Sequence, residues 1–165
     1  DGRIQLKEGQ INFLSAPTGT GKGFVSEHLC RRSNLPLLAV DPLRQLVRQT
    51  HSRLTKAGIN AVHYETEHPG DARDCDALAI CTPSVNPNKR VLEYFLNREG
   101  DTKINLLMDE AHLLAKQLFD TKQLYPRFYA ALDGYVETLV LMSATSTTNC
   151  QTLIERLQKD FYGGL

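Results

Sequence analysis

Short apolar runs alternate with segments of helical periodicity along the whole of this 165-residue chain. The apolar runs predict strands at residues 10–15, 37–40, 60–64, 77–81, 104–108 and 139–142. Between them, helices are expected at residues 22–32, from Pro42 onward, at 88–98, from Glu110 onward, at 125–132 and at 152–157. The helix after Pro42 would carry an apolar stripe of Leu43, Leu46, Val47 and Leu54, and the polar residues 63–76 are expected to form a loop. This alternation predicts an α/β domain with a mostly parallel sheet of about six or seven strands and helices on both faces.

The polar motifs of the sequence follow these predicted strands. They come after Leu14, Val40, Cys81, Met108 and Met142. In a parallel sheet the carboxyl ends of the strands share one edge, and ligands bind beyond that edge. We therefore expect the motifs to meet on one side of the molecule.

Length and composition suit one compact domain covering residues 1–165. The chain is 41% hydrophobic and 23% charged, as is usual for a globular protein, and it has no apolar stretch long enough to span a bilayer. The formal net charge is zero, so any contact with a nucleic acid must be local or shared with another domain. The first residue is Asp1, and we expect a fragment of a longer chain.

The four cysteines, Cys30, Cys75, Cys81 and Cys150, form no C-x-x-C pair. We expect them to be reduced and mostly buried, which indicates an intracellular protein, cytoplasmic or, in a eukaryote, nuclear. A metal site shared by Cys75 and Cys81 is disfavoured because the spacing of a ligand pair is missing.

A glycine-rich segment joins the first predicted strand to the first helix. Backbone N–H groups at the start of a helix can surround phosphate, and the glycines let the backbone approach it closely. A lysine at the end of the segment would place its ammonium group on the β- and γ-phosphates. The expected nucleotide-binding residues are Ala16, Pro17, Thr18, Gly19, Thr20, Gly21, Lys22 and Gly23.

Gly23 departs from the phosphate-loop pattern, which has Ser or Thr after the lysine as a Mg²⁺ ligand. The missing hydroxyl removes one oxygen from the metal shell, and water, Thr20 or Ser26 could replace that oxygen. Two hypotheses stay open. The domain is either a working ATPase or a degenerate domain that folds but holds nucleotide poorly.

Two adjacent carboxylates, Asp109 and Glu110, follow the apolar run at residues 104–108. Asp109 could hold Mg²⁺, and Glu110 could orient and polarise an attacking water, which is the division of labour that phosphoryl transfer needs. The alternative is a helix start at which acidic residues are favoured by the helix dipole.

Together, the ordered motifs resemble superfamily-two helicases with a DEAH box. The resemblance runs from Ser15 to Thr145. Residues 16–22 are similar to motif I, 41–49 to motif Ia, 82–84 to motif Ib, 109–112 to motif II and 143–145 to motif III. Each match is short, whereas the set in this order is specific.

The resemblance implies a role for each matching position. Lys22, Asp109 and Glu110 would be catalytic, with Asp109 on the metal. For four of these positions an alternative to the implied role stays open. It is a purely structural hydrogen bond for His112 and a plain turn for Ser143 and Thr145. For Arg44 it is a solvated helix face. The residues expected to couple nucleotide state to the nucleic-acid site are His112, Ser143, Ala144 and Thr145, and those expected at the nucleic-acid backbone are Pro42, Arg44, Thr82 and Pro83.

The resemblance also implies a fold and an activity. The chain would be the first RecA-like domain of an ATP-driven helicase or translocase that uses ATP and Mg²⁺ and acts on DNA or RNA. A second RecA-like domain of the same protein would complete the ATP site, so the isolated chain is expected to hydrolyse ATP very slowly. A small-molecule kinase is disfavoured because residues 109–112 and 143–145 occur together.

Overall fold

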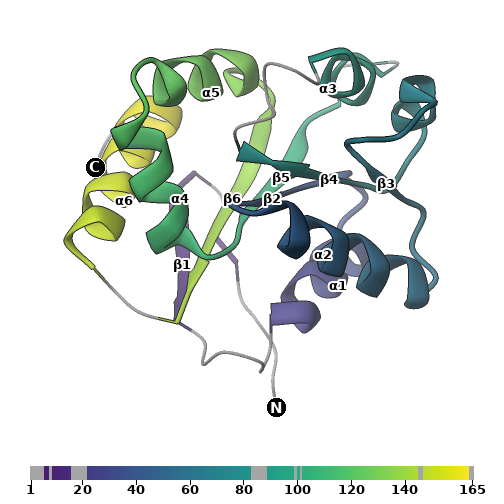
Figure 1. Ribbon diagram of the computed structural model, residues 1–165, viewed down its shortest axis with the longest axis horizontal. Coiled ribbons are helices and arrows are strands. Elements are labelled where there is room, and N and C mark those ends of the chain that lie inside the picture. The colour runs from purple at the N-terminus through teal and green to yellow at the C-terminus, as the bar shows by residue number, and fades with distance from the viewer. Residues whose placement is uncertain are drawn as a thin grey trace.

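The computed structural model describes residues 6–7, 9–15, 22–82, 89–98, 100, 102–144 and 147–163. Within these residues the core is a six-stranded sheet in which every neighbouring pair of strands is parallel (Figure 1). The strands are β1 (Ile11–Ser15), β2 (Leu37–Asp41), β3 (Ala61–His63), β4 (Ala77–Cys81), β5 (Ile104–Met108) and β6 (Val136–Ser143). Their order across the sheet is β1-β6-β5-β2-β4-β3.

Helices cover both faces of this sheet, so the predicted α/β architecture is confirmed. They are α1 (Lys22–Arg32), α2 (Arg44–Lys56), the 3₁₀ helix η1 (Pro69–Arg73), α3 (Lys89–Leu96), α4 (Ala111–Asp120), α5 (Leu124–Leu132) and α6 (Thr148–Tyr162). Helices α1 and α2 lie together on one side, and α4, α5 and α6 lie on the other (Figure 1). None of the helices described is both long and apolar enough to cross a bilayer.

The side chains of β2 show why its residues form a central strand. Leu37 and Ala39 pack into the cluster beneath α1 and α2, whereas Leu38 and Val40 face the larger cluster on the opposite side. All five residues of the strand are buried. A strand with both faces covered must be apolar at nearly every position, which is the pattern from which it was predicted.

The strand order brings the carboxyl ends of β1, β6, β5, β2 and β4 side by side. Ser15 at the end of β1 pairs with Ser143 at the end of β6, and Asp41 at the end of β2 pairs with Cys81 of β4. Beyond β5, the backbone N–H of Asp109 donates to the carbonyl of Val40 at 3.0 Å. The expected meeting of the motifs at one edge is therefore fulfilled for the strands that precede them.

Pro42 does not open a helix, contrary to the sequence prediction. Helix α2 begins at Arg44, after Leu43 in an extended conformation with φ −128° and ψ 144°. Because Leu43 precedes the helix, its side chain leaves the predicted apolar stripe and is 52% exposed. Val47 and Leu54 of the same stripe are fully buried, as predicted.

Two segments contain more helix than the sequence predicted. Helix α6 was predicted at residues 152–157 but starts at Thr148, because the Thr147 hydroxyl caps it by accepting from the Cys150 N–H at 3.1 Å. Gly163, with φ 75°, ends it. The segment 63–76, predicted as a loop, contains the short helix η1.

The four cysteines are free thiols, in agreement with the absence of a paired motif. Cys75, Cys81 and Cys150 are buried, and Cys30 is half-buried. Burial raises the pKa of Cys30 to about 12 and that of Cys75 to about 11, so both thiols stay protonated and unreactive at neutral pH. Among the residues described, no group of three or more His, Cys, Asp or Glu side chains is placed to hold a metal ion.

Candidate functional site

Asp109 and Glu110 form the corner between β5 and α4. The Glu110 N–H donates to Asp109 Oδ1 at 2.8 Å, which holds the first carboxylate against the backbone. Glu110 is in the left-handed region, with φ 52° and ψ 51°, a conformation that costs a residue with a side chain about 1–2 kcal/mol. Strain of this kind is typical of sites where geometry matters. The corner places both carboxylates at the carboxyl edge of the sheet.

His112 connects this corner to the end of β6. Its Nδ1 lies 2.8 Å from Ser143 Oγ, and its Nε2 lies 3.7 Å from Glu110 Oε2. Ser143 is fully buried, and Ala144 beyond it is half-buried. The imidazole thus bridges a carboxylate of one motif and a hydroxyl of another. The structural hydrogen bond that the sequence left open for His112 is present, and its partner, Ser143, is another predicted coupling residue. Thr145 lies outside the described residues.

The glycine-rich segment is only partly within the described residues. Ala16, Pro17, Thr18, Gly19, Thr20 and Gly21 lie outside them, as does the side chain of Lys22. The backbone of Lys22 begins α1, which follows β1, and β6 alone separates β1 from β5 in the sheet. Lys22 and Asp109 are therefore carried by nearby strands and lie beyond the same edge.

Gly23, at the second position of α1, lies directly under a side chain of α2. A Cβ atom at this glycine would be 2.8 Å from Nε and 3.2 Å from Cζ of Arg53. Both distances are shorter than ordinary van der Waals contact, so the outer part of the Arg53 side chain, from Cδ to the guanidinium, occupies the space of the side chain that Gly23 lacks.

The described residues supply only part of the Mg²⁺ shell that the resemblance implies. Asp109 supplies a carboxylate, but position 23 has no hydroxyl. The Ser26 hydroxyl, the nearby substitute among the described residues, donates to the carbonyl of Gly23 at 3.0 Å. In addition, the positive charge of Arg53 lies over Gly23, where it would repel a divalent cation.

The residues predicted at the nucleic-acid backbone differ in accessibility. Arg44, the first residue of α2, is exposed. Thr82 is fully buried, and its hydroxyl donates to the carbonyl of Asp41 at 3.5 Å, so the predicted contact cannot be made by the Thr82 side chain in this arrangement. Pro42 is also buried, with its carbonyl accepting from Gln117 Nε2 at 2.8 Å. Pro83 lies outside the described residues.

Sequence reasoning missed Arg53 and assigned no role to the buried pair formed by Asp41 and Thr50. The Thr50 hydroxyl donates to Asp41 Oδ2 at 2.9 Å. These three side chains line one small cavity together with Ser26 and Asp109. The 3.6-residue period marked only the apolar face of α2, and no local pattern signals which polar residue of that helix reaches α1.

Comparison with known proteins agrees with the geometry. The sequence model of the DEAD/DEAH box helicase family matches residues 4–153. The chain belongs to the DEAD/DEAH box helicase family. It is therefore a domain of the helicase type, as the ordered motifs and the sheet indicated. A comparison with curated protein sequences gave no match.

Solved structures of similar fold include two helicase proteins. One is S. cerevisiae Dbp5 bound to RNA and ADP BeF3, with a TM-score of 0.65 and 20% identity over 90% of this chain and 39% of that one. The other is a hypothetical ATP-dependent RNA helicase from Sulfolobus tokodaii, with a TM-score of 0.59 and 20% identity over 93% of this chain and 46% of that one. At this identity the likeness supports the helicase fold, and the chain spans less than half of either protein.

Proposed function

We propose that this DEAD/DEAH-family chain is the first RecA-like domain of a DEAH-box motor, which in the full-length protein couples ATP hydrolysis to movement on, or unwinding of, RNA or DNA. The observation that carries the proposal is the Asp109–Glu110 corner, joined through His112 to Ser143. Residues 109–112 read Asp-Glu-Ala-His, which favours the DEAH type within the family.

Phosphoryl transfer depends mainly on positioning and on stabilising charge, so few residues need to take part in the chemistry. In this proposal the segment from Ala16 to Lys22 binds the phosphates of ATP. Glu110 orients the attacking water and accepts its proton. Asp109 positions Glu110, because its carboxylate accepts the Glu110 N–H.

The bridge by His112 supplies a route for coupling. A change in the position of Glu110 on nucleotide binding or hydrolysis would alter its contact with His112, and His112 holds the end of β6 through Ser143. The segment after β6 would pass this change to the nucleic-acid site. Coupling of this kind requires two states with different contacts, and this bridge is a contact that can differ between them.

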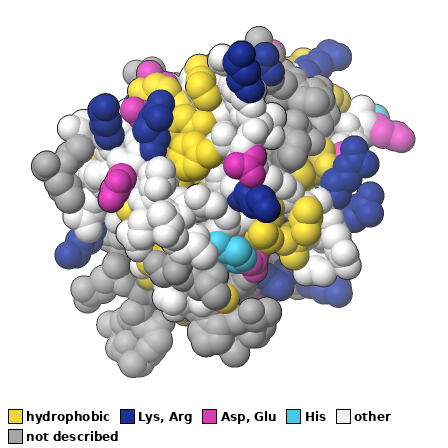
Figure 2. Space-filling view, turned by 60° about the vertical axis from the view of Figure 1, so that its left-hand side comes forward, with side chains coloured by type: hydrophobic (Ala, Val, Ile, Leu, Met, Phe, Trp, Pro, Cys, Tyr) yellow, Lys and Arg dark blue, Asp and Glu magenta, His cyan; other side chains and the backbone are white. Residues whose placement is uncertain are grey.

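The nucleic acid would be contacted locally rather than over a broad basic surface. Basic and acidic side chains are interspersed on the face shown in Figure 2, and the formal net charge is zero. Arg44 is exposed near the motif edge and is placed to contact the phosphate backbone. A second RecA-like domain of the full-length protein would contribute the rest of the surface, in an intracellular setting.

The test is ATP turnover by the full-length protein alone, with single-stranded RNA and with single-stranded DNA. We expect at least one of the two nucleic acids to raise the rate about tenfold or more, and the stronger stimulator identifies the substrate class. The isolated chain should hydrolyse ATP very slowly and unwind nothing. If the full-length protein binds nucleotide but does not hydrolyse it, either alone or with RNA or DNA, the motor is contradicted. That result would favour the degenerate domain that Gly23 suggests.

A further inference from the structure

Arg53 and Gly23 form a matched pair between α2 and α1. Glycine inside a helix costs about 1 kcal/mol relative to alanine, because its backbone loses more freedom on folding. Here the missing side chain leaves room for the guanidinium of Arg53, since even a single Cβ atom at position 23 would lie 2.8 Å from Arg53 Nε. The glycine therefore leaves open the space that the Arg53 side chain occupies.

Arg53 lies over the start of α1, the helix that follows the glycine-rich segment. It lines a small cavity together with Ser26 of α1, Asp41 at the end of β2 and Asp109 beyond β5. Arg53 is exposed to solvent, and its guanidinium makes no hydrogen bond or ion pair with any described residue. Its donors are thus available at the place where the phosphate-loop pattern expects a hydroxyl group.

A guanidinium is well suited to replace a metal at a phosphate. It is permanently charged, and its planar donors match two oxygens of a phosphate group at once. A cation already present near Asp109 also lowers the gain from binding a second, divalent cation at the same place.

We propose that Arg53 contacts the phosphates of the bound nucleoside triphosphate. Its guanidinium replaces the hydroxyl of the usual loop and part of the positive charge that Mg²⁺ would supply there. Nucleotide binding therefore depends only weakly on Mg²⁺. This inference rests on the proposed function, because it assumes that a nucleotide binds between α1 and β5. It adds a binding residue, in α2, that the helicase motifs did not indicate.

The experiment measures the affinity of the full-length protein for a fluorescent ATP analogue, with Mg²⁺ and with EDTA. We expect wild-type affinity to fall by less than about tenfold in EDTA. Arg53→Gln should weaken binding about tenfold in EDTA, because a charge-assisted contact is lost. Lys56→Gln removes the same charge from the last turn of the same helix and should leave the affinity unchanged.

Changes at Gly23 separate the displacement of Arg53 from the missing hydroxyl. Gly23→Ala displaces the end of the Arg53 side chain and should weaken binding in EDTA, though by no more than Arg53→Gln does, and the double variant should lose no more than Arg53→Gln alone. Gly23→Thr should show the same loss in EDTA and recover affinity in Mg²⁺, so that its dependence on the metal exceeds that of the wild type. Thermal unfolding of each variant shows whether it is folded.

The outcomes are distinct. If wild type binds no nucleotide under either condition, the proposed function fails and this inference fails with it. If wild type binds but only in Mg²⁺, or if Arg53→Gln and Gly23→Ala both bind as wild type in EDTA, the nucleotide site stands and the role of Arg53 is overturned. If Arg53→Gln is unfolded, the folded Gly23→Ala variant decides by the same comparison.

Discussion

His112 Nδ1 lies 2.8 Å from Ser143 Oγ and so joins two motifs that are 31 residues apart in the sequence. The other ring nitrogen lies 3.7 Å from the carboxylate of Glu110. One imidazole therefore connects the residue proposed to activate water with the end of the neighbouring strand β6.

Removing the bridge should reduce coupling more than catalysis. For His112→Ala and Ser143→Ala, the ratio of nucleic-acid-stimulated to basal ATPase rates in the full-length protein should fall about tenfold, within the usual range of coupling free energies. Because the two residues act through one contact, the double variant should show about the same loss as each single one. His68→Ala, at an exposed histidine, is the control. Additive losses in the double variant would show that the bridge is not the coupling element.

Glu110→Gln should abolish most ATP turnover while nucleotide still binds. The amide keeps the size of the side chain but cannot accept a proton, so the rate should fall at least about 100-fold. The Glu110 N–H to Asp109 contact is made by the backbone and is retained. Turnover and affinity for an ATP analogue are measured together, with Glu155→Gln on the exposed face of α6 as the control. A rate within tenfold of wild type would remove Glu110 from the chemistry.

Arg98 should be important for stability, because it binds three carbonyl groups. Its Nε donates to Phe95, and its Nη2 donates to Ala72 and Cys75, each at 3.0 Å. Ala72 and Cys75 are buried, so Arg98→Met would leave their carbonyls unsatisfied and lower the free energy of unfolding by about 2 kcal/mol. Urea unfolding measures this, and Arg90→Met, at an exposed arginine of α3, should change stability by less than about 0.5 kcal/mol.

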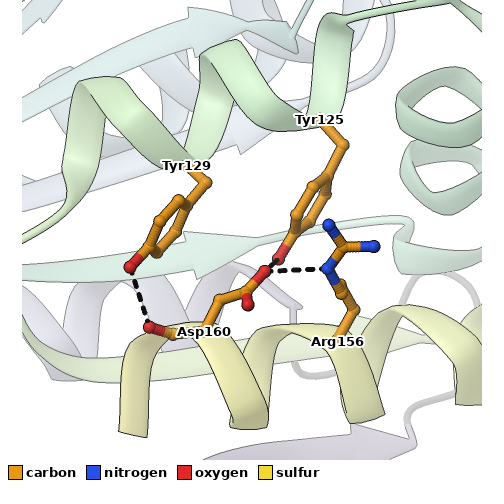
Figure 3. A network of polar contacts seen from close by, with 4 residues as sticks. All are labelled: Tyr125, Tyr129, Arg156 and Asp160. Atoms are coloured by element: carbon orange, nitrogen blue, oxygen red, sulfur yellow. Dashed lines mark hydrogen bonds and ion pairs between the residues drawn. The ribbon is translucent and has the colours of Figure 1, made fainter. Parts of the chain in front are cut away.

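Tyr125 should make the domain sensitive to alkaline pH. Its hydroxyl donates to Asp160 at 2.8 Å, and Asp160 also accepts from Arg156 Nε at 2.9 Å (Figure 3). Burial, and then the neighbouring Asp160, raise the pKa of Tyr125 above its ordinary value. The folded state thus keeps the phenol proton when the unfolded chain loses it, so the stability from this group is intact below about pH 10 and falls as the pH rises further.

Tyr125→Phe tests both parts of this prediction. The variant should lose about 1 kcal/mol of unfolding free energy near neutral pH, because the hydrogen bond to Asp160 is gone. Above about pH 10 its stability should fall less steeply than that of wild type. Tyr135→Phe, at a tyrosine whose hydroxyl makes an exposed bond to Asn97, is the control. Equal pH slopes in wild type and Tyr125→Phe would contradict the assignment.

Much of the fold could be predicted from local patterns. The strands at residues 77–81 and 104–108 and the helix at 22–32 have the predicted bounds, because continuous apolar runs and the start signals of helices are local properties. The predictions failed where a neighbour outside the pattern intervened. Leu43 was placed in a helix by periodicity, but it precedes α2 and is exposed.

The candidate site divides in the same way. The sequence alone determined which motifs exist and that they follow strands, because a parallel sheet with helical crossovers puts the carboxyl ends of its strands on one edge. Only the tertiary structure decided the strand order that sets β6 beside β5 and brings Ser143 to His112. It also decided the packing of α2 on α1 that lays Arg53 over Gly23. Contacts between residues about 30 positions apart depend on how whole elements pack, and no local periodicity carries that information.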